Sequence, residues 1–313
     1  MKYLVTGGAG FIGSHIVEAL LNRGNEVICI DNLSSGSCSN IKLFESNSNY
    51  TFYKENILEP RATQDIVKEK PDCIFHLAAI PNVAKSIDYP NETFETNVIG
   101  TKNILDAARI NKTPVVFSSS SSVYGGTSIL PTPESAPLNP QSPYAMHKQM
   151  GEMLCKQYAL YFGVKSICLR YFNVTGPRQQ ANSAYGAVIP AFIEAHLNNK
   201  TYFVEGTGEQ YRDFCYIDNV VQANLLAAKK IDYFEGECFN IGNGYTCSIN
   251  KLADKIAMLT DKKTKRVNTS SRPGDVFGSQ ADITKAKKLL GYNPKFLLED
   301  GLKTTIEWWR KQK

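Results

Sequence analysis

Residues 6–13 of this 313-residue chain read Thr-Gly-Gly-Ala-Gly-Phe-Ile-Gly, between an apolar run and an amphipathic segment. Tyr3–Thr6 predicts a strand, and Ile12, Ile16 and Leu20 then repeat at helical spacing. Glycines at the first, fourth and seventh places after the strand allow a tight turn, close approach to a pyrophosphate, and packing of helix on strand. A helix that begins there directs free N–H groups toward an anion. The motif predicts a βαβ unit that binds a dinucleotide.

The same alternation of strand and helix continues through the first half of the chain. Continuous apolar runs predict buried parallel strands at Glu26–Ile30, Asp72–Leu77, Pro114–Ser118 and Ser166–Tyr171. Long helices are expected over Pro90–Ile110 and Pro143–Phe162, each with a proline near its start. We therefore predict an α/β fold with a doubly wound parallel sheet of the Rossmann type.

The character of the sequence changes after Phe172. The segment 175–185 is rich in Gly, Gln, Asn and Pro and predicts a loop, whereas Val188–Asn198 predicts a helix. We expect a dinucleotide-binding domain at 1–172 and a second, smaller α/β substrate domain at 173–313. The apolar run Phe239–Gly242 indicates that a segment near 213–246 returns to the first sheet.

Composition excludes several classes of protein. The net charge is only +5, and the basic clusters have no interleaved aromatic residues, so we expect no nucleic-acid partner. The eight cysteines form no CxxC pair and several lie in apolar runs, which is typical of buried thiols in a reducing compartment. The glycine motif begins by Thr6, and no run approaches the ~18 apolar residues of a membrane span. We predict a cytoplasmic protein with no metal site and no membrane partner.

Asp31 bears on the choice of cofactor. It ends the second predicted strand, 24 residues after Gly7, close to the ~20 expected for a carboxylate that binds adenosine ribose hydroxyls. No Lys or Arg occurs between it and Lys42, so a 2′-phosphate would meet an unneutralised carboxylate. NAD is favoured over NADP, although a purely structural βα turn remains the alternative.

Tyr144 and Lys148 lie four residues apart on one predicted helix, and therefore on the same face. Ionising a phenol at pH 7 costs roughly 4 kcal/mol. One cation at ~4 Å supplies an interaction of that order at an effective dielectric near 20. We expect Lys148, with the positive nicotinamide of NAD⁺, to hold Tyr144 as a base.

The spacing of this pair is not unique in the chain. Tyr50 with Lys54 and Tyr161 with Lys165 repeat it. Only the pair at 144 and 148 follows soon after a strand that ends in hydroxyls, Ser118–Ser122, near the edge where α/β sheets bind ligands.

Together these motifs resemble an extended short-chain dehydrogenase/reductase, and over nearly the whole chain a nucleotide-sugar 4-epimerase of the UDP-glucose 4-epimerase type. The residues that carry the resemblance are Gly7/Gly10/Gly13, Asp31-Asn32, Phe75–Ala79, Asn97–Thr101, the serine run with Val123-Tyr124-Gly125, Tyr144/Lys148, Arg170–Asn173, Arg212–Phe214 and Arg272–Asp275.

The resemblance implies a set of site residues. Ser120, Tyr144 and Lys148 would form the catalytic triad. The NAD site would comprise Gly7, Gly10, Phe11, Ile12, Gly13, Asp31, Asn32, Ser35, Gly36, Asn56, Ile57, Leu77, Ala78, Ala79, Asn97, Tyr144, Lys148 and Phe172. The nucleotide sugar would contact Ser120, Ser122, Tyr144, Asn173, Val188, Phe203, Arg212, Arg272, Asp275 and Ser279.

The chain departs from the family pattern at two positions. Asn56 stands where an Asp usually contacts the adenine amino group, although its amide oxygen can still accept that bond. Thr175 stands where an aromatic residue is common, and nothing in the sequence explains it.

The implied reaction is C4 epimerisation of a UDP-hexose through a transient 4-keto sugar. A 4,6-dehydratase would need an acid and a base after Ser120, but Ser121-Ser122 stand there. A UDP-glucuronate 4-epimerase stays open as an alternative, although Asn173 and Gln179 fit hexose epimerases better. An NAD-sensing binding protein is disfavoured because the whole triad is present.

Two further expectations follow from the resemblance. Ser279 stands where members confined to plain hexoses often carry Tyr, which predicts room for UDP-N-acetylglucosamine and UDP-N-acetylgalactosamine. Pro90–Ile110 and Pro143–Phe162 resemble the helices of a four-helix dimer interface, which predicts a homodimer.

Overall fold

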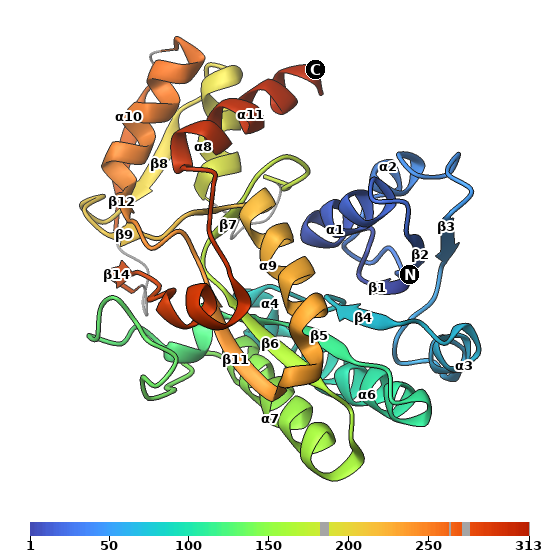
Figure 1. Ribbon diagram of the computed structural model, residues 1–313. Helices are drawn as coiled ribbons and strands as arrows, with labels where there is room; N and C mark the ends of the chain where they lie inside the picture. Colours follow the sequence, from blue (N-terminus) through green and yellow to red (C-terminus); the bar gives the residue numbers. More distant parts are fainter. Residues whose placement is uncertain (182–187, 263, 271–275, 313) are drawn as a thin grey trace.

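The computed structural model describes residues 1–181, 188–262, 264–270 and 276–312. Seven strands of this part of the chain form one sheet in the order β3-β2-β1-β4-β5-β6-β11 (Figure 1). They are β1 (Lys2–Thr6), β2 (Glu26–Ile30), β3 (Tyr50–Tyr53), β4 (Cys73–His76), β5 (Val115–Ser120), β6 (Ser166–Tyr171) and β11 (Glu235–Ile241). All neighbouring pairs are parallel, and the strand order reverses at β1 and β4. The predicted doubly wound α/β sheet is confirmed.

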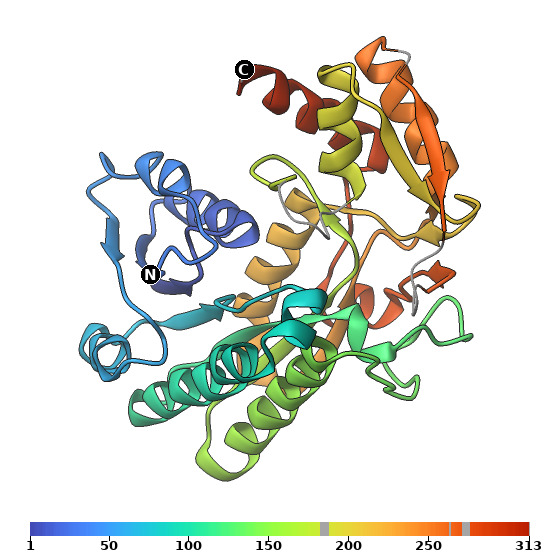
Figure 2. The same cartoon turned by 180° about the vertical axis from the view of Figure 1, so that it is seen from behind.

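Helices cover both faces of this sheet (Figures 1 and 2). On one face α1 (Phe11–Leu21) packs against α9 (Ile217–Lys230). On the other face α6 (Gly100–Asn111) lies between α3 (Pro60–Glu69) and α7 (Pro143–Phe162).

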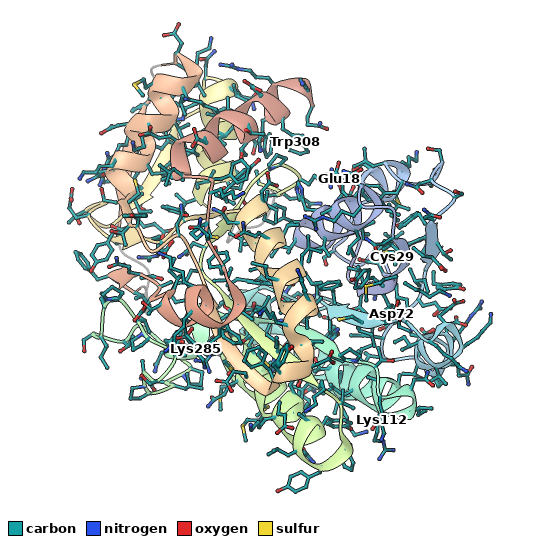
Figure 3. The ribbon with its side chains drawn as sticks, in the orientation of Figure 1. Glu18, Cys29, Asp72, Lys112, Lys285 and Trp308 are labelled. Carbon is teal, nitrogen blue, oxygen red and sulfur yellow. The ribbon has the colours of Figure 1, made fainter. Side chains whose placement is uncertain are left out.

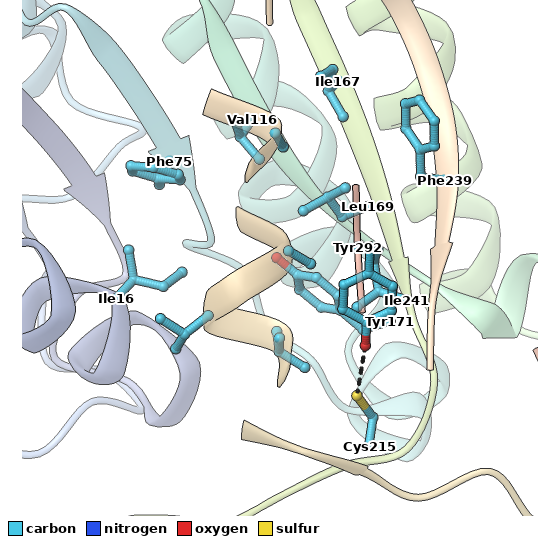
Figure 4. Close-up of a cluster of buried hydrophobic side chains, with 14 of the residues drawn as sticks. Ile16, Phe75, Val116, Ile167, Leu169, Tyr171, Cys215, Phe239, Ile241 and Tyr292 are labelled. Carbon is cyan, nitrogen blue, oxygen red and sulfur yellow. Dashed lines mark hydrogen bonds between the residues drawn. The ribbon is translucent and has the colours of Figure 1, made fainter. Parts of the chain in front are cut away.

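Alternate residues of each strand supply the two cores, because successive side chains point to opposite faces of a sheet. On β4, Phe75 belongs to the core under α1 and α9, whereas Ile74 belongs to the core under α3 and α6. Figure 4 shows the first core, to which Val116 on β5, Leu169 on β6 and Phe239 on β11 contribute. Buried on both faces, the strands read as continuous apolar runs.

The second part of the chain lies above the carboxyl ends of the strands. Its short strands are β7 (Val174–Thr175), β8 (Tyr202–Glu205), β9 (Tyr211–Arg212), β10 (Cys215–Tyr216), β12 (Cys247–Ser248), β13 (Arg266–Thr269) and β14 (Gly278–Ser279). Strand β8 pairs with β13, β7 with β10, and β9 lies between β12 and β14. Helices α8 (Val188–Leu197), α10 (Ile249–Thr260) and α11 (Leu298–Lys311) share an apolar core with Phe192, Leu252 and Ile306 (top of Figure 1). Between these segments the chain returns to the sheet, where Phe239 pairs with Leu169.

The remaining elements are short. They are α2 (Cys38–Lys42), α4 (Val83–Asp88), α5 (Pro90–Phe94), the π-helix η1 (Glu95–Ile99), and the turns η2 (Ser121–Tyr124), η3 (Ile231–Tyr233) and the π-helical η4 (Ala286–Leu290). In the described residues no helix is both long and apolar enough to cross a membrane. All eight cysteines are free thiols.

Two predicted elements need correction, and one strand was missed. The helix expected over Pro90–Ile110 is divided into α5, η1 and α6, since one turn widens to π-helical hydrogen bonding. The strand expected at Pro114–Ser118 begins one residue later and continues to Ser120, which carries the serine run into the sheet. Strand β3 was not predicted because a polar Ser/Asn stretch precedes it, and it forms the sheet's edge.

Candidate active site

A cavity of about 900 Å³ opens at the carboxyl ends of β1, β4 and β5 and extends toward the second part of the chain. This is where doubly wound sheets bind ligands. Most predicted site residues line it: Gly7, Gly10, Phe11, Ile12, Gly13, Asp31, Asn32, Ser35, Asn56, Ile57, Leu77, Ala78, Ala79, Ser120, Ser122, Tyr144, Lys148, Phe172, Asn173, Arg212 and Ser279. A second cavity of about 290 Å³ shares Asn173 and Arg212 with the first, and Val188 and Phe203 line it.

Four predicted site residues are not among these. Gly36 packs beside Asp31, where an added Cβ would lie 3.1 Å from Asp31 Oδ1. Asn97 is buried, and its amide binds the backbone of Ile80, accepting from N at 2.7 Å and donating to O at 3.2 Å. Gly36 and Asn97 thus support the wall of the cavity from behind. Arg272 and Asp275 lie outside the described residues.

The glycine turn after β1 has the close fit that a dinucleotide phosphate needs. Gly7 has φ +71°, and an added Cβ would lie 2.7 Å from the backbone N of Ala78. At Gly13 an added Cβ would lie 2.2 Å from Gly7 O, so α1 packs directly on the loop. Gly10 is the N-cap of α1, and no described side chain caps this helix. The first N–H groups of α1 are therefore available to an anion, and the residues fit the pyrophosphate of NAD.

Asp31 lies at the end of β2 as predicted. Its Oδ2 accepts from the backbone N of Ala9 at 3.0 Å, and its Oδ1 accepts from the backbone N of Leu33 at 2.8 Å. Burial raises the pKa of this carboxyl, and the two backbone hydrogen bonds oppose that shift. Asn56 Oδ1 already accepts from the backbone N of Leu58 at 3.0 Å.

Tyr144, Lys148 and Ser120 come together where α7 meets the end of β5. Ser142 caps α7 by accepting from the backbone N of Ala145, and proline follows the cap, so the helix begins just before Tyr144. Lys148 Nζ donates to the carbonyl of Ser118 at 2.7 Å and lies 5.9 Å from the centre of the Tyr144 ring.

Burial dominates the electrostatics of this group. It raises the pKa of Tyr144 to about 12, against a hydrogen bond from Ser120 that lowers it. It also lowers the pKa of Lys148 to about 8, against the opposing influence of Cys155 and Glu152. The ammonium alone therefore does not make the phenol acidic, since Nζ is directed to the carbonyl of Ser118. The expected base requires a second positive charge in the cavity.

The residues predicted for the sugar nucleotide meet at the junction of the two cavities. Arg212 Nη1 donates to the carbonyls of Tyr211 and Phe277, at 3.0 and 3.2 Å. Ser279 pairs in register with Arg212 across β14 and β9. Asn173 has φ +25° and its Nδ2 donates to Asp213 O at 3.1 Å. These residues are far apart in sequence and are assembled by the second part of the fold.

Thr175 lines the second cavity, and its buried hydroxyl has no hydrogen-bond partner among the described residues. Ser122 likewise lines the larger cavity with a buried hydroxyl that the described residues leave unpartnered. Both hydroxyls are free to bond a polar ligand.

Sequence reasoning missed two groups around the cavity. Arg178 lines it and donates to Glu18 Oε2 at 2.6 Å, which joins the loop after β7 to α1, where Figure 3 labels Glu18. His76 joins two strands and a helix, with Nδ1 2.7 Å from Thr6 Oγ1 and Nε2 3.0 Å from Thr101 Oγ1. His76 belongs to the motif Phe75–Ala79 and Arg178 to the predicted loop at 175–185, but spacing alone does not indicate which side chains bond to each other.

The sequence profile of the NAD dependent epimerase/dehydratase family matches residues 3–242. The chain belongs to this family. A putative UDP-glucose 4-epimerase of Methanocaldococcus jannaschii is 38% identical over 98% of this chain and 98% of its own length. The resemblance stated from the motifs is confirmed.

Solved structures of the family match the whole chain. The UDP-glucose 4-epimerase of Thermotoga maritima with UDP-glucose has a TM-score of 0.93 and 40% identity, covering 100% of this chain and 99% of its own. The UDP-N-acetylglucosamine 4-epimerase of Methanobrevibacter ruminantium, in complex with UDP-N-acetylmuramic acid, has a TM-score of 0.94 and 38% identity, with the same coverages. The chain is an enzyme of the NAD-dependent epimerase family, and the predicted enzyme class and cofactor are confirmed.

Proposed function

We propose that this epimerase interconverts UDP-glucose and UDP-galactose at C4 and also accepts the corresponding N-acetylated UDP-hexosamines. The observation that carries the proposal is that two adjoining cavities share lining residues. Ser120, Tyr144 and Lys148 line the same cavity as the glycine turn, and that cavity meets a second one at Asn173 and Arg212. A dinucleotide and a nucleotide sugar can therefore both reach the triad.

NAD⁺, when bound, supplies a reversible acceptor for the C4 hydride. With the C4 hydride taken up by that acceptor, loss of the C4 hydroxyl proton to Tyr144 would leave a 4-keto sugar, and the same phenol would return the proton after the sugar has turned over. Lys148 stabilises the phenolate, and Ser120 hydrogen-bonds the phenol or the sugar oxygen. The proton and the hydride both return, so the reaction has no net redox change.

The remaining site assignments are part of the same proposal. Residues 1–172 hold NAD and 173–313 hold the nucleotide sugar, with a segment near 213–246 returning to the first sheet. Arg212 supports this division because a guanidinium offers fork-shaped donors that suit a diphosphate. Arg272 and Asp275 are assigned to the sugar nucleotide by the resemblance alone.

Other reactions of the family fit these residues less well. A dehydratase needs a proton donor and a base next to Ser120, but η2 begins with two serines, Ser121 and Ser122. The sugar bound by a uronate epimerase carries a carboxylate, which needs a cationic side chain as its partner. Among the described residues, the cationic side chains that line the larger cavity are Lys148, Arg178 and Arg212. Lys148 is bonded to Ser118, Arg178 is bonded to Glu18, and Arg212 is assigned to the diphosphate in this proposal.

We also propose a homodimer formed through the outer faces of α5, α6 and α7. Apolar side chains are exposed there, including Phe94, Ile110, Met153 and Leu160. A patch of that kind on a protein surface marks an interaction site. Light scattering is expected to show a dimer for the parent and a monomer for M153E/L160E.

A cytoplasmic location is proposed from the eight free thiols.

The reaction is tested with the purified enzyme and a panel of UDP-hexoses, UDP-N-acetylhexosamines, UDP-glucuronate and dTDP-glucose. The expected result is conversion of the first two kinds to their C4 epimers with no net consumption of NAD. Turnover of UDP-glucuronate alone, or release of water from dTDP-glucose, would replace the proposal with one of the alternatives.

A further inference from the structure

Three successive turns of α7 face three successive residues of β5. Tyr144 interacts with Ser120 at the end of the strand, and this interaction lowers the pKa of the phenol against the effect of burial. One turn later, Lys148 donates to the carbonyl of Ser118 at 2.7 Å. One turn further, Glu152 Oε1 accepts from Ser119 Oγ at 2.5 Å. The first two turns belong to the proposed chemistry, whereas the third faces away from the sugar.

Glu152 is held from a second side by Arg170 on β6. The contact is bidentate, with Nε 2.8 Å from Oε1 and Nη2 2.7 Å from Oε2. The two side chains are only 6% and 5% exposed. Burial lowers the pKa of Arg170, but the hydrogen bond to Glu152 together with the charge interactions with Cys238, Glu152 and Tyr124 outweighs it, so the net shift of this pKa is upward. A buried pair of this kind has little net value for stability over apolar packing, but its planar geometry fixes position.

The guanidinium also reaches the wall of the cavity. Arg170 Nη1 donates to the phenol oxygen of Tyr124 at 2.8 Å, and that phenol donates to Asn240 Oδ1 at 2.7 Å. Asn240 Nδ2 donates to the carbonyl of Thr132 at 2.9 Å. Tyr124 and Thr132 both line the larger cavity. One buried network thus connects the third turn of α7 with the wall opposite Tyr144.

Beside this network α7 and β5 are in close contact. At Gly151 an added Cβ would lie 2.3 Å from the ring of Phe117. The helix therefore lies directly on the strand, and apolar contact there sets the distance between them. Apolar packing does not fix how far a helix slides along a strand, whereas directional bonds from Glu152 to Ser119 and Arg170 do.

We propose that Glu152 and Arg170 are positioning residues that fix the register of α7 against β5, and so the placement of Tyr144 and Lys148 against Ser120. The inference rests on the proposed function, because it assigns these two residues a part in the same catalytic step. They touch neither substrate nor cofactor and act through the helix.

Glu152 also bears on the charge of Lys148. The titratable groups around this ammonium are Tyr144, His147, Glu152 and Cys155 on α7 and His76 on β4. Burial lowers the pKa of Lys148, and Cys155 and Glu152 act in the opposite direction. Loss of the carboxylate is therefore expected to lower the pKa of Lys148 further.

The decisive variant is E152M/R170M, which removes both charges together and leaves neither one buried alone. Because apolar replacement of a buried ion pair is often neutral for stability, the free energy of unfolding is expected to stay close to the parent value. We expect kcat to fall about 10- to 100-fold while KM changes less than about threefold, since the geometry of the reacting groups is lost and sugar binding is not. The alkaline limb of the kcat profile is expected to move to lower pH.

The matched control is K2M/E69M. This pair joins Lys2 Nζ and Glu69 Oε2 at 3.1 Å, at the opposite end of β1 from the cavity. Its removal is expected to leave kcat and the pH profile unchanged. A folded E152M/R170M with the parent's kcat and pH profile would overturn the inference and leave the pair a purely structural role.

Two single substitutions decide the matter if the double variant does not fold. S119A removes one bond to Glu152, and Y124F removes one bond to Arg170. Each is expected to lower kcat about three- to tenfold with KM unchanged, and parent-like kcat in both would contradict the inference.

Titration of the Lys148 side chain by ¹³C NMR, assigned with K148M, helps to separate the positioning role from the proposed function. A parent that epimerises no UDP-sugar would overturn the proposed function, whereas an active parent whose E152M/R170M variant keeps the parent's kcat and Lys148 pKa would overturn the positioning role.

Discussion

The two ends of the cavity are built in different ways. At the dinucleotide end, the wall consists largely of backbone from a few contiguous segments, and its shape depends on the absence of side chains at Gly7 and Gly13. At the sugar end, side chains from distant segments meet, with Asn173, Arg212 and Ser279 on different elements. The first end is therefore intolerant of any added atom, whereas the second can change its selectivity through single side chains.

The largest effect is expected where the two ends meet. Y144F removes the hydroxyl that we propose transfers the proton, and it is expected to lower kcat about 10³-fold while NAD binding persists. Turnover of UDP-glucose and the affinity for NAD by calorimetry check the two halves of this statement.

Y161F is the matched control, because Tyr161 lies on the same helix, also has a lysine four residues later, and is 77% exposed. It is expected to leave kcat unchanged. Equal turnover by Y144F and the parent would remove the phenol from the mechanism.

The next largest effect is expected from a substitution at the dinucleotide end. G7A places a Cβ 2.7 Å from the backbone N of Ala78, and is expected to weaken NAD binding by at least about tenfold, or ~1.4 kcal/mol. G24A is the control, because Gly24 has nearly the same φ, +72°, but an added Cβ there meets nothing within 4 Å. Both variants lose about 1 kcal/mol of stability to backbone strain. An equal loss of NAD affinity in both would show that strain, not the close approach, governs the site.

The free energy of unfolding and the activity are both expected to depend on pH through Lys148. Burial lowers the pKa of Lys148 to about 8 from its ordinary 10.5. Between these values the unfolded chain binds more protons at this lysine than the folded chain does, so its contribution to the free energy of unfolding rises with pH. Activity is expected to fall over the same window as the ammonium is lost.

Urea unfolding and kcat are measured for the parent and for K148M from pH 7 to 10.5. They check that the contribution of Lys148 to stability rises with pH and that activity falls. The variant is expected to lack this rise in stability. A parent whose activity and stability change in the same direction over this window would contradict the assignment.

The two ends also differ in how far the sequence predicts them. The glycine turn, Asp31 and the Tyr144–Lys148 pair were found because each depends on spacing within one element or between neighbours. The alignment of Ser279 with Arg212, and the hydrogen bonds of Arg178 to Glu18, join residues at least 67 positions apart and depend on the tertiary fold. The effect of burial, which raises the pKa of Tyr144 to about 12, has no signature in a four-residue motif and could not be predicted from the sequence.

The smallest expected effect concerns selectivity at the sugar end. Ser279 lines the larger cavity on β14 and pairs with Arg212. The preceding residue, Gly278, packs on the ring of Tyr211, where an added Cβ would lie 2.6 Å away.

The added ring in S279Y is therefore expected to enter the space beside the sugar. We expect kcat/KM to fall about tenfold for the N-acetylated UDP-hexosamines and less than about threefold for UDP-glucose. S279A removes the hydroxyl without adding bulk and is expected to keep the parent's preference. If S279Y lowers kcat/KM equally for both kinds of sugar, this position does not select between them, and the sugar end resembles the dinucleotide end in being set by backbone shape.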